Sequence, residues 1–227
     1  MGLFSSENLT ARTSDSRYTT GEEIANSITH GLGAGLAIAG LVLLVYYSAI
    51  YGTAWHIVSC AIYGTTLVLL YTVSTLYHSI PSPKFKSVMR ILDHSAIFLL
   101  IAGTYTPFML VSLRGPWGWS LFGVIWGTAI LGILFQTALQ KSWVALTVAL
   151  YILMGWAVII AVKPLLNVMP TEGFLLLLYG GVAYTLGTAF YIWKQMRFHH
   201  AIWHLFVLAG SVFHFFAVFY YVVPEMS

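Results

Sequence analysis

Three histidines in this sequence have the residue type and spacing that a metal site requires. His200 and His204 lie four positions apart, so in a helix both imidazoles share one face and can bind the same ion. His78, from another apolar segment, would supply the third ligand, and three nitrogen ligands with one open position are typical of catalytic zinc. We prefer zinc as the bound metal, although imidazole ligands also suit iron, copper and nickel. The alternative is that these histidines only extend to the water at a membrane surface.

Two further polar residues are candidates for catalytic groups beside such a metal. Ser74 lies one helical turn before His78 on the same face, so its hydroxyl can orient a ligand or hydrogen-bond the water of the metal. Asp93 is an acid in a largely apolar stretch, and it can orient the same water and transfer protons as a general base or acid. An ion pair of Asp93 with Arg90 or Lys194 is the structural alternative.

A third group of polar residues precedes the first long apolar stretch. His30 lies about two turns inside that stretch, and Glu23 and Asn26 come before it on a similar helical face. We predict that these three side chains lie behind the metal ligands and orient them. A helix-capping and packing role for Glu23 is the alternative.

These residues must be positioned by helices that cross a membrane. Of the 227 residues, 59% are apolar and 7% are charged, whereas soluble domains carry about 25% charged residues. A membrane-spanning helix needs about 20 apolar residues, and strands of outer-membrane barrels are about half as long and alternate. We therefore predict an all-α bundle of seven transmembrane helices in a single domain, 22–227, after a short disordered cytoplasmic tail, 1–21. The predicted spans are 24–47, 56–78, 91–111, 119–138, 143–162, 174–193 and 200–223.

The distribution of positive charge predicts the orientation of this bundle. Cytoplasmic loops carry an excess of Lys and Arg. With seven spans, eight of the ten Lys and Arg residues fall on the side of the N-terminus: Arg12, Arg17, Lys84, Lys86, Arg90, Lys141, Lys194 and Arg197. The N-terminus is therefore predicted to be cytoplasmic and the C-terminus outside. This topology places His78, Asp93, His200 and His204 at one depth near the cytoplasmic face.

Small residues and one proline indicate how the helices pack. Gly31, Gly33, Gly35 and Gly40 suit the close approach of helices in lipid. Pro107 is expected to kink the third span, because it lacks the amide that would continue the helical hydrogen bonds.

Three motifs give the chain a resemblance to the progestin and adipoQ receptor family, and within it to the bacterial hemolysin III-related membrane proteins. The motifs are Glu23-x-x-Asn26-x-x-x-His30, then Ser74-x-x-x-His78 followed by Asp93-His94, and His200-x-x-x-His204 followed by His214. The resemblance implies a seven-helix fold and a zinc site near the cytoplasm, with His78, His200 and His204 as ligands. It also implies that Asp93 holds the water of the zinc and that Ser74 lies in the inner environment of the site.

The resemblance extends to the alkaline ceramidases, which hydrolyse lipid amides, and implies a role in bacterial membrane lipid homeostasis. The leading hypothesis is a zinc-dependent, hydrolase-like protein of the bacterial cell (inner) membrane, with a membrane lipid as substrate or ligand and no nucleic acid partner. One alternative is a membrane sensor or homeostasis factor without turnover, in which zinc is structural. The other is a hemolysin-like pore-former, which the sequence disfavours because secreted cytolysins need a soluble form and this chain is apolar throughout.

Overall fold

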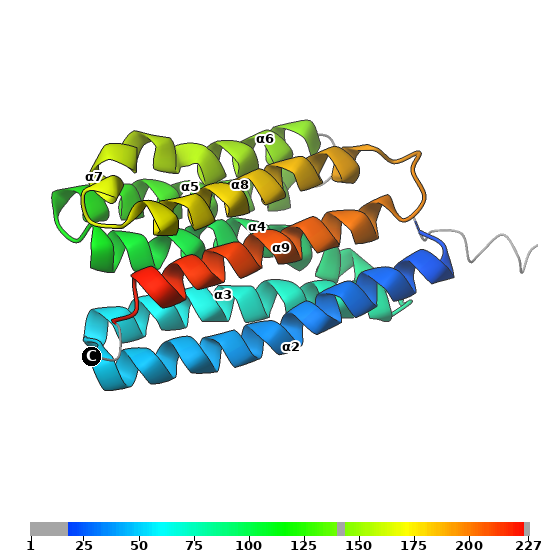
Figure 1. Ribbon diagram of the computed structural model, residues 1–227. Coiled ribbons are helices and arrows are strands. Elements are labelled where there is room, and N and C mark those ends of the chain that lie inside the picture. The colour runs from blue at the N-terminus through cyan, green and yellow to red at the C-terminus, as the bar shows by residue number, and fades with distance from the viewer. Residues whose placement is uncertain (1–17, 140–143, 225–227) are drawn as a thin grey trace, which may run out of the picture.

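The computed structural model describes residues 18–139 and 144–224, and this part of the chain is helical (Figure 1). Seven of its segments are long and apolar enough to cross a membrane, which confirms the all-α, seven-span prediction. The elements are α2 (Thr20–Tyr51), α3 (Ala54–Ser79), α4 (Pro83–Pro107) with the π-helical turn η1 (Phe108–Ser112), α5 (Pro116–Leu139), α6 (Val144–Gly155) with the 3-10 turn η2 (Trp156–Ala161) and α7 (Val162–Leu166), α8 (Thr171–Ile192) and α9 (His199–Tyr221). The side of the membrane that each end faces stays a prediction.

The first helix begins inside the segment that was predicted to be a tail. Thr19 caps α2 through a capping box, in which the Glu22 amide donates to Thr19 Oγ1 at 3.3 Å and the Thr19 amide donates to Glu22 Oε2 at 2.9 Å. This polar cap lies before the first apolar turn, so α2 starts at Thr20 and not at residue 24. The rest of the predicted tail, 1–17, lies outside the described residues, and so does Lys141.

Two prolines mark irregular turns in the spans. After Pro107, the predicted kink is a π-helical turn, η1, and the hydroxyls of Thr104 and Thr106 donate to carbonyls one turn earlier at 2.8 Å. The fifth span was predicted to end at 162, but it continues to Leu166. A 3-10 turn precedes α7, which places Pro164 in the first turn of that helix, where no backbone amide is needed.

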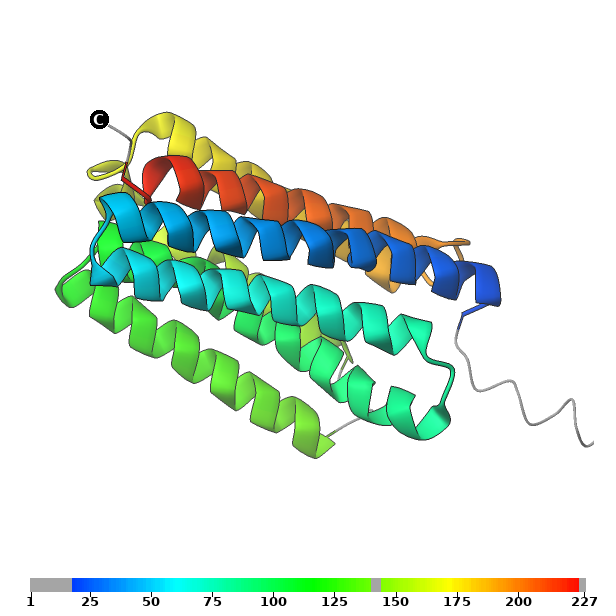
Figure 2. The same ribbon diagram turned by 90° about the horizontal axis from the view of Figure 1, so that it is seen from below.

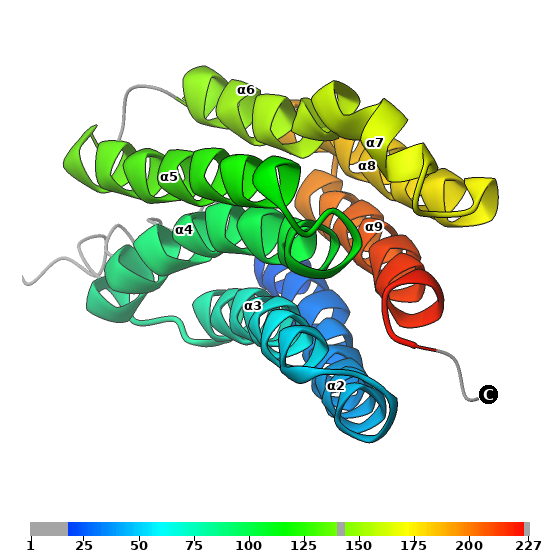
Figure 3. The same cartoon turned by 90° about the vertical axis from the view of Figure 1, so that its left-hand side faces the viewer.

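The seven spans form a closed ring. Each span packs against the next one along the chain, and α2 packs against α9 to close the ring (Figure 3). Figure 2 shows α2 lying between α3 and α9 along most of its length. The first turns of α2 and α9 and the last turn of α3 therefore meet at one end of the bundle, which we call the histidine end because it carries His78, His200 and His204.

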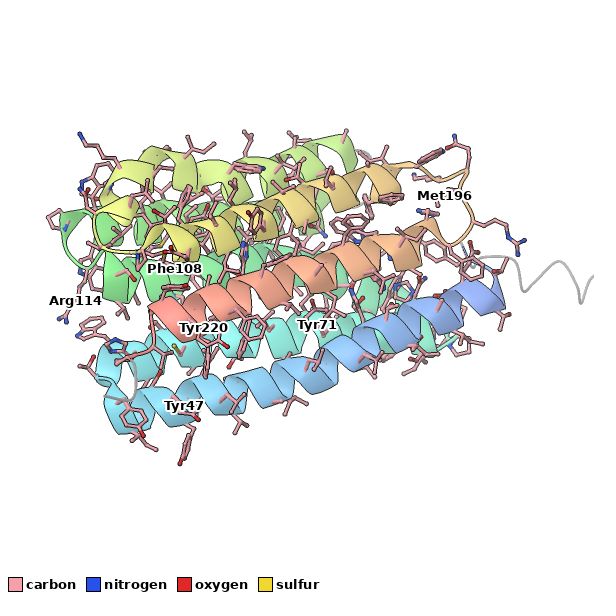
Figure 4. The ribbon with its side chains drawn as sticks, in the orientation of Figure 1. Tyr47, Tyr71, Phe108, Arg114, Met196 and Tyr220 are labelled. Atoms are coloured by element: carbon pink, nitrogen blue, oxygen red, sulfur yellow. The ribbon has the colours of Figure 1, made fainter. Side chains whose placement is uncertain are left out.

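Close packing of α2 on α3 depends on Gly33. A Cβ atom at this position would lie 2.5 Å from Cδ1 of Tyr71, whose side chain lies inside the bundle (Figure 4). Tyr71 is fixed, since it is 1% exposed and its hydroxyl donates to Ser211 Oγ at 2.7 Å. Gly40 is also tight, because its Cβ would lie 3.0 Å from Phe215, whereas a Cβ at Gly35 would meet nothing within 4 Å. Only some of the predicted packing glycines therefore lie at a close contact.

Substitution of Gly33 by alanine is expected to destabilise the bundle by about 1–3 kcal/mol, because the added methyl group overpacks the contact with Tyr71. Gly35→Ala is the matched control on the same helix, and it should leave the protein as stable or slightly more stable, because Ala favours helix over Gly by about 1 kcal/mol. Thermal unfolding of the two purified variants in detergent measures the difference. Equal Tm shifts for both variants would contradict the assigned contact.

Candidate metal centre

The three predicted ligand histidines come together at the histidine end. His78 lies in the last turn of α3, and His200 and His204 lie in the first two turns of α9. One nitrogen from each imidazole lies within 4.8 Å of the others. The three residues are buried, with exposed fractions of 3%, 7% and 1%. Three buried imidazoles at this spacing can hold one metal ion.

A carboxylate orients the first of these ligands. Oε2 of Glu23 lies 2.6 Å from Nδ1 of His78, and its Oε1 accepts a hydrogen bond from Nζ of Lys86 at 2.5 Å. When Nδ1 donates to the carboxylate, Nε2 keeps its lone pair for a metal, which is the usual arrangement behind a metal-bound histidine. Nε2 of His78 is buried and has no hydrogen-bond partner in the described part of the chain. Its position therefore fits a metal ligand.

The second ligand is oriented in the same way by the backbone and a hydroxyl of α2. Nδ1 of His204 lies 3.1 Å from Thr29 Oγ1 and 3.3 Å from the carbonyl oxygen of Asn26. Thr29 Oγ1 donates in turn to the carbonyl of Ala25 at 2.9 Å, so it can accept from the imidazole. Thr29 was missed in the sequence, although its helical spacing of three from Asn26 could have indicated it.

The residues predicted to lie behind the ligands have three different roles. Glu23 pairs with His78, and the capping role that the sequence left open for Glu23 is performed by Glu22. The Asn26 amide nitrogen lies 3.4 Å from His78 Nδ1. His30 stacks on His204, with ring centroids 3.5 Å apart and an interplanar angle of 13°, and neither of its nitrogens has a hydrogen-bond partner within the described residues. His30 thus supports the ligand by ring contact.

Asp93 and Ser74 line a cavity beside the histidines. The cavity has a volume of about 130 Å³ and is also lined by His30, His200 and His204. Ser74 Oγ is buried without a hydrogen-bond partner among the residues described. Asp93 does not pair with Arg90 or Lys194 in the described structure; its Oδ2 lies 3.5 Å from Nδ1 of His94. Both predicted catalytic residues therefore line the same cavity as the ligands His200 and His204, where a bound molecule can reach them.

The backbone before α9 is strained at the point that positions His200. Phe198 has a φ of 57°, in the left-handed region, which costs a residue with a side chain about 1–3 kcal/mol. Its amide donates to Oε1 of Glu22 at 3.0 Å. The same carboxylate caps α2, so one side chain connects the starts of α2 and α9. This connection holds the helix of His200 and His204 against the helix of Glu23 and Thr29.

The donor set fits a metal ion by its chemistry. Two of the imidazoles use Nδ1 for hydrogen bonds to α2, and the third, His200, has a buried Nδ1 with no hydrogen-bond partner within 18–139 and 144–224. Neutral imidazoles without thiolates suit zinc, iron, copper or nickel. The arrangement leaves room for a further ligand on the side of the cavity.

Removal of the Glu23 carboxylate is expected to weaken metal binding about 10- to 100-fold in Glu23→Ala, because His78 loses the group that fixes its tautomer and orientation. Competition with a chromophoric chelator measures the affinity. Glu172→Ala, at the start of α8 and at the other end of the bundle, is the control and should bind metal as the unchanged protein does. An unaltered affinity in Glu23→Ala would show that the carboxylate does not act on the ligand.

Comparison with known proteins identifies the family. A family model described as "Haemolysin-III related" matches residues 18–215, which include all of the site residues. The chain belongs to this family. The resemblance predicted from the three motifs is therefore confirmed, and the chain is a multi-pass membrane protein with seven candidate spans.

The relatives include bacterial and animal proteins. "Hemolysin-3" of Bacillus cereus is 50% identical over 206 residues, covering 91% of this chain and 94% of the relative. "Hemolysin-3 homolog" of Bacillus subtilis (strain 168) is 52% identical over 206 residues, covering 91% and 97%. "Monocyte to macrophage differentiation factor" of Homo sapiens is 29% identical over 206 residues, covering 88% and 84%.

Proposed function

We propose that this chain is a zinc-dependent hydrolase that cleaves an amide bond of a membrane lipid. The observation that carries the proposal is the buried cluster of His78, His200 and His204, with one nitrogen from each within 4.8 Å of the others. Asp93 lines the cavity beside this cluster and can exchange protons. A ligand cluster without an adjacent proton carrier would favour a purely structural metal.

Different residues at this site would perform different steps of the hydrolysis. Zinc in this site would make water nucleophilic at neutral pH and polarise a carbonyl group. His78, His200 and His204 would hold the ion. Asp93 would accept a proton from the attacking water and return it to the leaving amine. Ser74 Oγ, which has no hydrogen-bond partner in the described structure, would orient the carbonyl or the water.

The walls of the cavity support a lipid as the substrate. Apart from the polar groups near the histidines, the cavity is lined largely by aliphatic and aromatic side chains such as Leu70, Ile97 and Leu100. Such walls can hold the part of an acyl chain next to the amide and exclude bulk water from the reacting bond. The lipid would therefore place its amide at the histidine end and its chain among the helices.

The charges favour placing the histidine end in the cytoplasm. Five described Lys and Arg residues lie in the loops and helix starts at this end: Lys84, Lys86, Arg90, Lys194 and Arg197. Arg114 and Lys163 lie at the other end. The excess of positive charge on cytoplasmic loops supports a bacterial cell membrane protein with its N-terminus inside.

Turnover of a lipid amide tests the proposal. Purified protein in liposomes is given an N-acylated long-chain amino alcohol, and the released fatty acid is measured with and without added zinc. We expect zinc-dependent release, and no release from the matched lipid in which an ether replaces the amide. Stoichiometric metal without any turnover across a panel of lipid amides would reject the hydrolase.

A structural metal in a non-enzymatic homeostasis or sensor protein is the second candidate. The observation that favours it is the place of the three ligands, because His78 belongs to α3 whereas His200 and His204 belong to α9. These helices both pack on α2, and among the described residues they contact each other at only a few positions, such as Tyr71 with Ser211. A metal ion would join them directly and stabilise the ring by binding only the folded state.

A further inference from the structure

The residue before the cap of α2 lies over the histidine cluster. The ring of Tyr18 stacks on His200, with centroids 5.0 Å apart and an interplanar angle of 29°. Its centroid lies 5.9 Å from that of His78 and 5.8 Å from that of His199. Tyr18 therefore contacts two of the three ligand imidazoles as well as their neighbour. Tyr18 itself is half-buried.

The position of Tyr18 is fixed by the same carboxylate that connects α2 and α9. Thr19, the next residue, accepts a hydrogen bond from the Glu22 amide and donates its own amide to the Glu22 carboxylate. That carboxylate also accepts the amide of Phe198, two residues before His200. The backbone that carries Tyr18 is thereby held against the start of the helix that carries two ligands.

The histidine cluster borders both the cavity and the ring of Tyr18. His200 and His204 line the cavity within the ring of helices. The ring of Tyr18, which is not among the residues that line this cavity, lies against His78 and His200. Although His78 and His200 lie at the ends of their helices, the two residues are only 3% and 7% exposed. An aromatic ring in this place can shield the ligands from water without binding the metal itself.

From these contacts we infer that Tyr18 closes the metal centre at the histidine end and sets the rate at which water-borne reagents and metal ions reach it. The biological role of this closure rests on the proposed function of the metal centre. The closure itself is a property of the ring contacts and holds for the metal-free protein too. In this arrangement the ion would reach the cluster past Tyr18, whereas a lipid would reach it through the cavity.

The accessibility of His200 in metal-free protein tests the closure. The full chain in detergent is stripped with a chelator and treated with diethyl pyrocarbonate, and the rate of His200 modification is followed by peptide mass spectrometry. Tyr18→Ala should raise this rate about tenfold. In the unchanged protein the ring of Tyr18 must leave its contacts with the histidines before the reagent can reach His200, and aromatic contacts of the usual strength correspond to about that factor. Tyr18→Phe should keep the original rate, since it retains the ring. Tyr46→Ala, an exposed tyrosine farther along α2, is the matched control and should change nothing.

His214 serves as the internal control for folding. It lies ten residues beyond His204 on α9 and is held by a contact of its Nε2 with the Leu177 carbonyl at 3.1 Å, away from Tyr18. Its modification rate should be equal in all variants. An unchanged His200 rate in Tyr18→Ala, or a rise of the same size in Tyr18→Phe, would overturn the inference.

Release of zinc into a chelator adds a second measurement. Tyr18→Ala should bind as much zinc as the unchanged protein. It should release the ion about tenfold faster, because no aromatic ring has to move away from the ligands first. Loss of zinc stoichiometry in this variant would instead make Tyr18 part of the binding site and overturn the closure. Absence of zinc from every variant, with the faster His200 modification still present, would reject the proposed function and leave the closure supported.

Discussion

Replacement of both His200 and His204 by alanine is expected to reduce bound zinc from about one ion per chain to below about a tenth of that value, because a single imidazole does not complete a zinc site. Both residues lie on one face of α9 and, with His78, place a nitrogen within 4.8 Å of the other two. The double substitution leaves only His78. Elemental analysis of protein purified without added chelator measures the loss.

His199→Ala is the matched control for this variant. His199 is adjacent to His200 in the sequence, but its Nδ1 lies 3.0 Å from the Phe190 carbonyl and it is not part of the cluster. We expect this control to retain its zinc. An unchanged metal content in the double variant would remove the basis of both proposed functions. If another ion copurifies with the unchanged protein, the site is as described but the preference for zinc is wrong.

The variant that lacks His200 and His204 should also show how much the bound metal contributes to the stability of the folded protein. A bound ion stabilises the folded state by about 4 kcal/mol when its free concentration is a thousand times its Kd. Since the ion would connect α3 with α9, chelation should lower the Tm of the unchanged protein. The double variant should melt at the lower temperature from the start and show no further shift on chelation.

The seven helices were predictable because lipid demands long apolar segments and satisfies no backbone hydrogen bonds. The ends of the helices were less predictable. The start of α2 depends on the capping box of Thr19 and Glu22, and the end of the fifth span depends on a 3-10 turn that accommodates Pro164. The first feature depends on polar hydrogen bonds and the second on the shape of a proline ring. The apolar runs of the sequence carry little information about either.

The spacing of His200 and His204 indicated a metal site, since a helix brings positions four apart onto one face. The surroundings of the ligands were harder to derive. In α2, buried Asn26 and His30 face the bundle whereas exposed Ile28 and Leu32 face outward, the reverse of a soluble helix. Apolar patterning therefore does not give the rotation of such a helix. The helical spacing of Thr29 from Asn26 indicates a shared face, but the partner of Thr29 on α9, His204, appears only in the structure.

Substitution of Asp93 by asparagine is expected to lower lipid amide turnover about 10²- to 10⁴-fold, the usual contribution of a general acid–base, while zinc content stays the same. Asparagine keeps the size and polarity of the side chain but cannot accept a proton. Asp93 lines the cavity and is not one of the three clustered ligands, so the metal should remain bound. Turnover by purified protein in liposomes and elemental analysis of the same sample give the two numbers.

This variant also distinguishes the two proposed functions. Glu172→Gln makes the same change of carboxylate to amide at the other end of the bundle and should leave turnover intact. Turnover that survives in Asp93→Asn would exclude Asp93 as the proton carrier. Loss of both turnover and zinc would mean that Asp93 is needed to hold the metal. If zinc has only a structural role, membrane lipid composition in cells should be the same with Asp93→Asn as with the unchanged protein. It should change when His200 and His204 are replaced, because only that variant removes the metal-mediated connection between α3 and α9.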